Sequence, residues 1–246
     1  SIPFLYYFLP AVLIVYFLVP RVLKNTVLLL SSLVFYGWGE PVYLFLMVAT
    51  IGLNYACGYW IHNRRKNGQR GKPVLVVGIA ANLLILGFFK YAGFLLESLQ
   101  ALLPFLRGIP VPEISLPIGI SFYVFQSMSY IIDVYRNDAP VQKDPVGFGT
   151  YVTLFPQLIA GPIVRYADVA QQLQHRRENL PDFASGVMLF MVGLSKKMLL
   201  ANPMGNLCTE MMADTGTLSA WVGAIAFTLQ LYFDFSGYSD MAIGLG

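Results

Sequence analysis

Two aspartates in an otherwise apolar, glycine-spaced run are the residues of this sequence whose position most clearly suggests chemistry. The run is "LYFDFSGYSDMAIGLG", residues 231–246, and it carries Asp234 and Asp240. A carboxylate at the centre of a membrane helix costs about 2.5 kcal/mol or more, so such residues usually face a polar interior. Three roles are open for them: catalysis, lining of a channel, or hydrogen bonds that hold neighbouring helices together.

Helical spacing places the polar residues of this run on two adjacent stripes. Gln230, Asp234 and Tyr238 are four residues apart and share one stripe, and Ser236 shares the neighbouring stripe with Asp240. Small residues between them leave room for another backbone to approach closely. The spacing therefore predicts a helix that presents a hydrogen-bonding face to the interior of the protein.

A second polar stripe lies in residues 116–136. Gln126, Tyr130 and Asp133 follow one another at i, i+4 and i+7, and Arg136 comes just after them. Near a membrane boundary, Asp133 and Arg136 are expected to form an ordinary interfacial ion pair. The two stripes could contribute to one polar interior surface, although spacing alone does not make them face each other.

The segment "YVTLFPQLIAGPIVRY", residues 151–166, differs from the apolar runs around it. Pro156 and Gly161-Pro162 interrupt it, and Gln157 and Arg165 flank the break. Basic residues precede and follow the segment, which suggests a broken or re-entrant element rather than a crossing. Broken backbone at membrane depth is tolerated only where protein or a water-filled cavity surrounds it, so this element predicts a cavity.

Several familiar chemistries lack their residues here. The sequence has no nucleophile elbow, no phosphate-binding loop and no His, Cys and carboxylate cluster with metal-ligand spacing. His62 and His175 are expected to be solvated loop residues. Cys57 and Cys208 lie far apart in apolar sequence and are expected to be inert thiols, not a disulfide. The net charge of +3 is too small and too scattered to indicate nucleic acid binding.

Composition defines the elements that must position these residues. Hydrophobic residues make up 57% of the 246-residue chain and charged residues only 12%, about half the charge of a soluble domain. Several nearly charge-free runs have the length of a membrane-crossing helix. The sequence predicts an all-α, polytopic transmembrane helical bundle with one broken or re-entrant segment, and residues 1–246 are expected to form a single membrane domain.

Helix breakers and charges divide the chain into its expected elements. We expect a first membrane helix up to Pro20 that Pro10 kinks. The later expected apolar elements are residues 26–36, which look short for a span, and then 41–61, 73–96, 116–133, 183–201 and 218–246. Residues 62–72, "HNRRKNGQRGK", are the strongest positive cluster, so this loop is predicted to be cytoplasmic and the N-terminus to lie outside.

Three blocks resemble the membrane-bound O-acyltransferase family, in the branch of the alginate O-acetylation membrane protein. They are "LPIGISFYVFQSMSYIIDVYR" (116–136), "LFPQLIAGPIVRY" (154–166) and "LYFDFSGYSDMAIGLG" (231–246), in the expected order. The resemblance implies a multi-pass enzyme of the bacterial cytoplasmic membrane with a tunnel through the bilayer. It would hold no bound cofactor and would pass an acyl group from acetyl-CoA or another acyl thioester to a cell-surface polymer such as alginate, with extracytoplasmic acetyltransferase partner proteins.

The family's essential histidine lies beyond the "YFDFSGYSD" block, and this sequence ends at Gly246 before it. The resemblance therefore assigns no catalytic residue here and implies an N-terminal portion that is inactive alone. In the intact enzyme a histidine would act as general base on the acceptor hydroxyl, and Asp234 or Asp240 could orient it. The residues expected to line or support the tunnel are Gln126, Tyr130, Asp133, Gln157, Arg165, Gln230, Asp234, Tyr238 and Asp240.

Two other classes of protein stay open at this stage. A secondary transporter would use intramembrane carboxylates and broken helices to bind substrate and ions, but such proteins usually show paired breaks in two related halves. A membrane scaffold that docks a periplasmic partner would need no polar stripe at membrane depth. Proton-coupled uptake by the reconstituted protein would favour the transporter.

Overall fold

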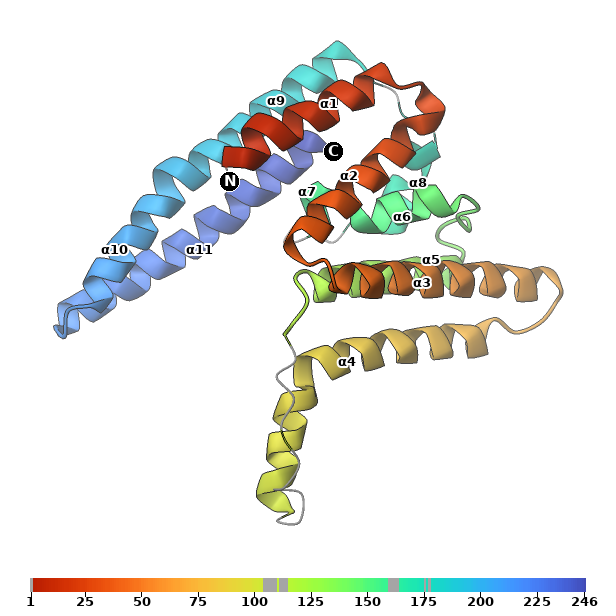
Figure 1. Ribbon diagram of the computed structural model, residues 1–246, viewed down its shortest axis with the longest axis horizontal. Coiled ribbons are helices and arrows are strands. Elements are labelled where there is room, and N and C mark those ends of the chain that lie inside the picture. The colour runs from red at the N-terminus through yellow and green to blue at the C-terminus, as the bar shows by residue number, and fades with distance from the viewer. Residues whose placement is uncertain (1, 104–109, 111–114, 159–163, 175, 177) are drawn as a thin grey trace. The chain divides into compact units, whose positions relative to one another are not determined.

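The computed structural model describes residues 2–103, 110, 115–158, 164–174, 176 and 178–246. These residues form helices and their connections, with no strand among them (Figure 1). Five helical stretches are long and apolar enough to cross a membrane: Arg21–Gly39, Tyr43–Lys66, Lys72–Leu102, Leu180–Met212 and Thr217–Leu245. The prediction of an all-α polytopic bundle is confirmed. His175 and Gly161-Pro162 lie outside the described residues.

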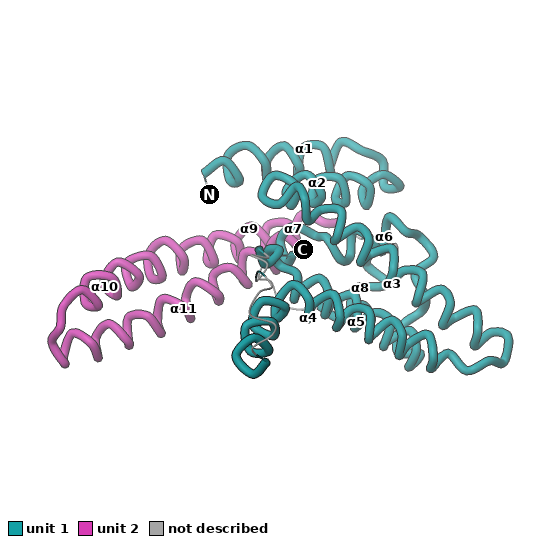
Figure 2. The backbone as a smooth tube through the Cα atoms, turned by 60° about the horizontal axis from the view of Figure 1, so that its bottom comes forward, with its two compact units in different colours: residues 1–158, 163–176 teal, residues 159–162, 177–246 magenta. Residues whose placement is uncertain are grey.

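The contacts divide the chain into two compact units, residues 1–158 with 163–176, and residues 159–162 with 177–246 (Figure 2). The first unit contains η1 (Phe4–Phe8), α1 (Leu9–Leu18), η2 (Arg21–Leu23), α2 (Lys24–Gly39), α3 (Tyr43–Lys66), α4 (Lys72–Leu102), α5 (Ile120–Arg136), α6 (Pro145–Thr153), α7 (Phe155–Leu158) and α8 (Tyr166–Gln174). The second contains α9 (Leu180–Ser195), η4 (Lys196–Ala201), α10 (Asn202–Met212) and α11 (Thr217–Leu245). That residues 1–246 form one membrane domain stays a prediction.

The second apolar run is longer than its sequence suggested. Helix begins at Arg21 and continues to Gly39, so the expectation of a short element at 26–36 is wrong. Lys24 is buried, and its ammonium lies 4.6 Å from the ring centroid of Tyr16. An aromatic face attracts a cation at this distance, which allows a lysine to sit inside the helical run.

Helix α5 starts later than predicted and is too short to count among the candidate spans. Gly119 has a φ of 73°, a left-handed conformation that glycine adopts without a steric penalty, and the helix begins with the next residue, Ile120. The expected helical positions 116–119 are instead a turn, in which the NH of Ile120 donates to the carbonyl of Pro117 at 3.2 Å. The 17-residue helix packs between other helices of the first unit, with most of one face fully buried.

Pro10 and Pro203 lie in the interior of continuous helical runs, and each directly follows a π-type turn. The NH of Leu9 bonds to the carbonyl of Phe4 just before Pro10, and the NH of Asn202 bonds to the carbonyl of Lys197 just before Pro203. The wider turn accommodates a ring that would clash with the regular helix. A kink was predicted at Pro10, where the structure has a π turn in a helical run that continues to Leu18. The π turn before Pro203 corrects the expected end at Ala201, because the helix continues to Met212.

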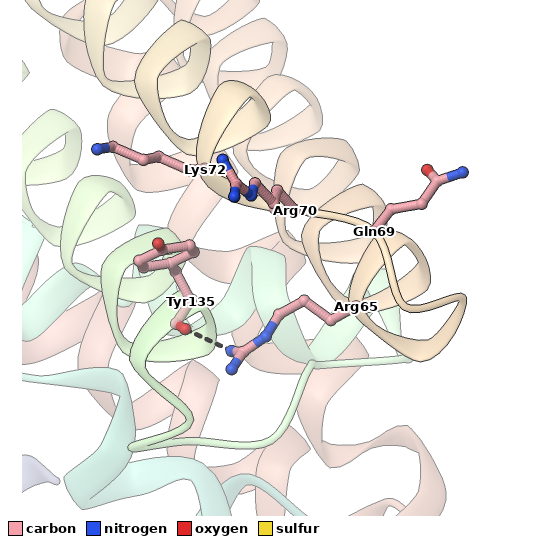
Figure 3. Close-up of a pocket in the computed structure, with 6 residues that line it drawn as sticks. Arg65, Gln69, Arg70, Lys72 and Tyr135 are labelled. Carbon is pink, nitrogen blue, oxygen red and sulfur yellow. Dashed lines mark hydrogen bonds between the residues drawn. The ribbon is translucent and has the colours of Figure 1, made fainter.

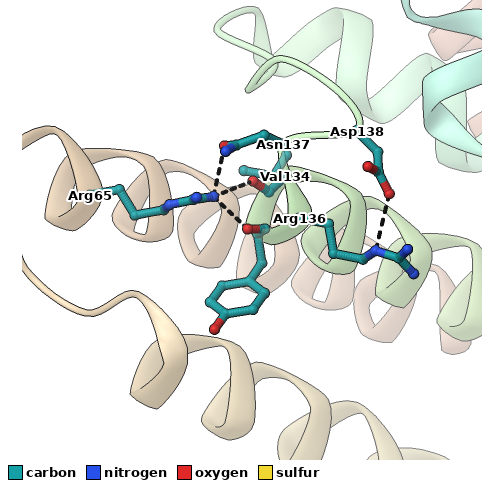
Figure 4. A network of polar contacts seen from close by, with 6 residues as sticks. Arg65, Val134, Arg136, Asn137 and Asp138 are labelled. Atoms are coloured by element: carbon teal, nitrogen blue, oxygen red, sulfur yellow. Dashed lines mark hydrogen bonds and ion pairs between the residues drawn. The ribbon is translucent and has the colours of Figure 1, made fainter.

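The basic segment 62–72 is helical in its first half, because α3 runs to Lys66. Arg65, on the last turn of α3, reaches the C-terminal end of α5 (Figure 4). Its Nη1 donates to the carbonyls of Val134, at 3.4 Å, and of Tyr135, and to Oδ1 of Asn137 at 2.7 Å. A cation at a helix C-terminus satisfies free carbonyls and complements the helix dipole. Arg65 thus joins α3 to α5.

A reciprocal amide pair joins α3 to α4. Nδ2 of Asn54 donates to Oδ1 of Asn82 at 3.0 Å, and Nδ2 of Asn82 donates to Oδ1 of Asn54 at 2.8 Å. Each Nδ2 also donates to a backbone carbonyl of its own helix, Thr50 at 2.9 Å and Gly78 at 2.7 Å. Both side chains are fully buried, so the pair satisfies its polar groups without water.

Replacing Asn82 with leucine is expected to lower the free energy of unfolding by about 2 kcal/mol, because it leaves the buried amide of Asn54 without its partner. The double replacement Asn54→Leu/Asn82→Leu removes both polar groups and is expected to cost less than the sum of the two single changes. Thermal unfolding of the detergent-solubilised protein measures all three. Strict additivity would show that the two amides do not depend on each other.

Candidate functional site

The predicted break around Pro156 is present in the first unit as the junction of α6 and α7. The NH of Leu154 closes α6 on the carbonyl of Thr150 at 3.0 Å, and the NH of Phe155 donates instead to Oγ of Ser32 on α2 at 3.1 Å. Pro156 has no NH to donate. The last carbonyls of α6 therefore lose their helical donors, and every residue from Gly147 to Thr153 is buried.

Two glutamines supply donors to one of these carbonyls. Nε2 of Gln126, on α5, donates to the carbonyl oxygen of Tyr151 at 2.7 Å, and Nε2 of Gln157, on α7, donates to the same oxygen at 2.9 Å. A buried carbonyl without a donor costs about 1–3 kcal/mol. The structure thus brings together Gln126 and Gln157 across the break, as partners of backbone rather than of each other.

Tyrosines surround this break. The Tyr151 hydroxyl donates to the carbonyl of Val164 at 2.8 Å and lies 3.3 Å from Oγ of Ser129. The Tyr130 hydroxyl accepts the NH of Gln142 at 3.2 Å, and its ring stands edge-on to Tyr166 with centroids 4.8 Å apart. These rings and hydroxyls tie α5, α6 and α8 into one core.

Asp133 is buried at the C-terminal end of α5. Only 3% of its surface is exposed, and within the described chain its Oδ2 has no hydrogen-bond partner. The backbone NH of Ala167 bonds to the carboxylate, and Arg165 brings positive charge toward it. The expected ion pair with Arg136 is wrong, because Arg136 pairs with Asp138 at 3.1 Å on the surface (Figure 4).

Losing one of the two glutamine donors is expected to be mild. Gln126→Leu or Gln157→Leu leaves the Tyr151 carbonyl one donor, so each should lower the free energy of unfolding by about 1 kcal/mol. The double variant leaves the buried Tyr151 carbonyl without a donor. It should therefore lower the free energy of unfolding by about 1 kcal/mol more than the sum of the two single effects. A double-mutant cycle by thermal or denaturant unfolding measures this. A double variant no worse than either single one would contradict the shared role.

The second unit pairs both aspartates of the opening motif with lysines. Nζ of Lys196 lies 2.5 Å from Oδ2 of Asp240 and 3.0 Å from Oγ of Ser236. Nζ of Lys197 pairs with Oδ1 of Asp234. The two lysines lie in the π turn η4, which faces α11. This pairing supports the role of holding helices together, and it gives each carboxylate a cation rather than a histidine.

Gln230 and Tyr238 are the other two residues of α11 that were predicted to line or support the tunnel. The amide of Gln230 lies near Gly205 of α10, because a Cβ added to Gly205 would be 2.7 Å from Nε2 of Gln230. Tyr238 is half-buried. Gln126, Tyr130, Asp133, Gln157 and Arg165 thus belong to the first unit, and Gln230, Asp234, Tyr238 and Asp240 to the second. A tunnel-lining role for these nine residues stays a prediction.

Sequence reasoning missed several partners. Lys196 and Lys197 lie near the end of the element expected at 183–201, and their spacing gave no indication that they face Asp240 and Asp234. The pairing of Asn54 with Asn82 could not be predicted, because the position of an isolated amide in an apolar helix does not indicate which side chain it bonds to. Within the described residues, no three His, Cys, Asp or Glu side chains gather closely enough to hold a metal ion.

Comparison with known proteins connects this arrangement to a family. The chain is 46% identical, over 99% of its length, to the probable alginate O-acetylase of Azotobacter vinelandii, and 42% identical over 99% to that of Pseudomonas aeruginosa. The chain is thus similar, over nearly all of its own length, to proteins named alginate O-acetylase. This confirms the resemblance carried by the three blocks. No family model matches the chain.

The alginate O-acetylase relatives are longer than this chain, which covers 50% of the first and 48% of the second. The chain therefore spans about half the length of the curated relatives it matches. A more distant relative, the peptidoglycan O-acetyltransferase of Helicobacter pylori, is 31% identical over 99% of the chain, which covers 52% of that protein. The names of these relatives agree on O-acetyl transfer and differ in the polymer.

Proposed function

We propose that this chain is part of a membrane-bound O-acyltransferase that transfers an acetyl group to hydroxyls of a cell-surface polysaccharide. The observation that carries the proposal is similarity over 99% of the chain to proteins named alginate O-acetylase and peptidoglycan O-acetyltransferase. The higher identity to the alginate proteins favours alginate or a similar polymer as acceptor. These names give no support to the transporter or scaffold alternatives.

The proposed reaction moves an acetyl group from a thioester, with acetyl-CoA as the donor we favour. The acceptor hydroxyl loses its proton to a general base, its oxygen attacks the thioester carbonyl, and the C–S bond breaks. The thiolate that leaves takes up the proton held by the base. We assign no residue of this chain as that base. The nine polar residues are proposed to act as tunnel wall or support. The two glutamine donors to the Tyr151 carbonyl and the paired aspartates of α11 support the second of these roles.

The proposed location is the bacterial cytoplasmic membrane, with residues 62–72 in the cytoplasm, the N-terminus outside and extracytoplasmic acetyltransferase proteins as partners. Five long apolar helices and the concentration of basic residues between α3 and α4 support this placement. Labelling of single cysteines at residues 62–72 by a membrane-impermeant maleimide tests the orientation. Labelling in intact cells would place this segment outside and reverse it.

The function is tested with the full protein in its own cells. Deleting its gene is expected to abolish O-acetyl groups on the polymer, measured by NMR of the isolated polysaccharide, while the amount of polymer stays the same. Plasmid-borne full protein should restore them. Normal O-acetylation in the deletion strain would refute the proposed function.

A further inference from the structure

The turn between α3 and α4 concentrates positive charge that the surrounding sequence does not balance. Five cationic residues lie between 64 and 72, and no Asp or Glu occurs between Glu40 and Glu97. Figure 3 shows one side of this turn, where Arg70, Lys72 and Tyr135 line a shallow depression of about 490 Å³. The ion pairs among described residues lie elsewhere in the chain, so this charge is available to an anionic ligand.

On its other side, the same turn opens into a groove of about 570 Å³ between α3 and α4. The polar mouth of the groove consists of Asn63, Arg64 and Asn67, which come from the end of α3 and its cap. All three are exposed. Arg64 supplies a guanidinium with several donors and the two asparagines supply amide donors, which together suit the oxygens of a phosphate.

The body of the groove is apolar. Leu53, Cys57 and Trp60 line it from α3 at i, i+4 and i+7, and Val74 and Val77 line it from α4. Trp60 is 58% exposed and Val77 is 65% exposed. Helices α3 and α4 are both long and apolar enough to cross a membrane, so the groove runs from a cationic mouth at the helix ends toward the apolar depth of the bilayer.

We propose that this groove binds one anionic phospholipid, with its phosphate at Arg64 and an acyl chain along α3 and α4. A cationic, donor-rich mouth in line with an apolar body matches the two parts of such a lipid, and basic clusters beside membrane helices attract anionic headgroups. A zwitterionic lipid fits less well, because its ammonium group would lie beside the guanidinium of Arg64 in the mouth of the groove. This inference does not depend on the proposed acyl transfer.

Lipid retention tests the site directly. The full protein is placed in nanodiscs of equal parts phosphatidylglycerol and phosphatidylcholine, and native mass spectrometry counts the lipids that stay bound on release. We expect one phosphatidylglycerol to be retained in preference to phosphatidylcholine. Arg64→Gln should lower its retention about fivefold, since one basic residue near the surface contributes about that factor. Equal retention of the two lipids would overturn the proposal.

Two matched controls separate this site from general charge and from general surface changes. Lys90→Gln removes the same charge from an exposed position of α4 outside the groove, and should leave retention unchanged. Val77→Trp fills the groove and should reduce retention, whereas Val76→Trp, at an exposed neighbour that does not line it, should not. An effect of Lys90→Gln as large as that of Arg64→Gln, or intact retention in Val77→Trp, would refute the assigned groove.

Discussion

Replacing Gly237 with leucine is expected to force α9 and α11 apart and to destabilise the second unit by about 3 kcal/mol, the upper part of the range for overpacking. A Cβ at Gly237 would lie 2.6 Å from the carbonyl oxygen of Gly193 and 3.3 Å from the NH nitrogen of Lys197. Both are backbone atoms, which cannot rotate away as a side chain can. Relief therefore requires the helices to separate, which also pulls η4 away from the carboxylates of α11.

The contact is part of a repeated pattern. Gly193 faces Gly237, and one heptad away Gly186 faces Gly244 at equally close range, where a Cβ would lie 2.5 Å from the partner carbonyl. Small residues at such positions let membrane helices approach backbone to backbone. Thermal unfolding in detergent measures the effect.

Gly87→Leu is the matched control for Gly237→Leu. It makes the identical change inside α4, where a Cβ meets nothing within 4 Å. It should be neutral or slightly stabilising, because leucine is the better helix former. Similar unfolding temperatures for the two variants would contradict the proposed close packing of α9 and α11.

Removing Lys196 is expected to be nearly as damaging as the glycine change. Lys196→Met leaves the carboxylate of Asp240 without its cation, and breaking a partly buried pair by removing one partner costs about 3 kcal/mol. The two side chains are 31% and 21% exposed in the isolated chain, and both lie within helices long and apolar enough to span a membrane. The double variant Lys196→Met/Asp240→Leu removes both charges and should recover most of the lost stability.

The pair of Arg136 and Asp138 provides the comparison. Its side chains are 62% and 47% exposed, so Arg136→Met should cost less than about 1 kcal/mol. Both experiments use the unfolding transition of the same detergent-solubilised protein. If Lys196→Met were as mild as Arg136→Met, or if the double variant were as unstable as the single one, the pair would not contribute to the packing of α9 and η4 against α11.

The parts of the fold that follow from local chemistry were predicted well. The helix break at Pro156 follows from a missing NH, which the sequence shows directly. The stripe of Gln126 and Tyr130 follows from helical periodicity, and the structure places both in the core. Element ends were less predictable. Gly119 delays the start of α5, and the π turn before Pro203 prolongs a helix, because each depends on a backbone conformation that neighbouring residues do not specify.

The sequence by itself determined an all-α membrane architecture, since chain composition and apolar run length set which solvent can surround the backbone. It also determined that Asp234 and Asp240 need polar partners, because the cost of a bare carboxylate in an apolar helix does not depend on fold. Only the tertiary structure decided which partners they have. Lys196 and Lys197 precede the aspartates by about 40 positions, and the close approach of Gly193 and Gly237 brings them within reach. Such a pairing depends on the distance between two helices in space. The spacing of residues along either helix gives no information on that distance.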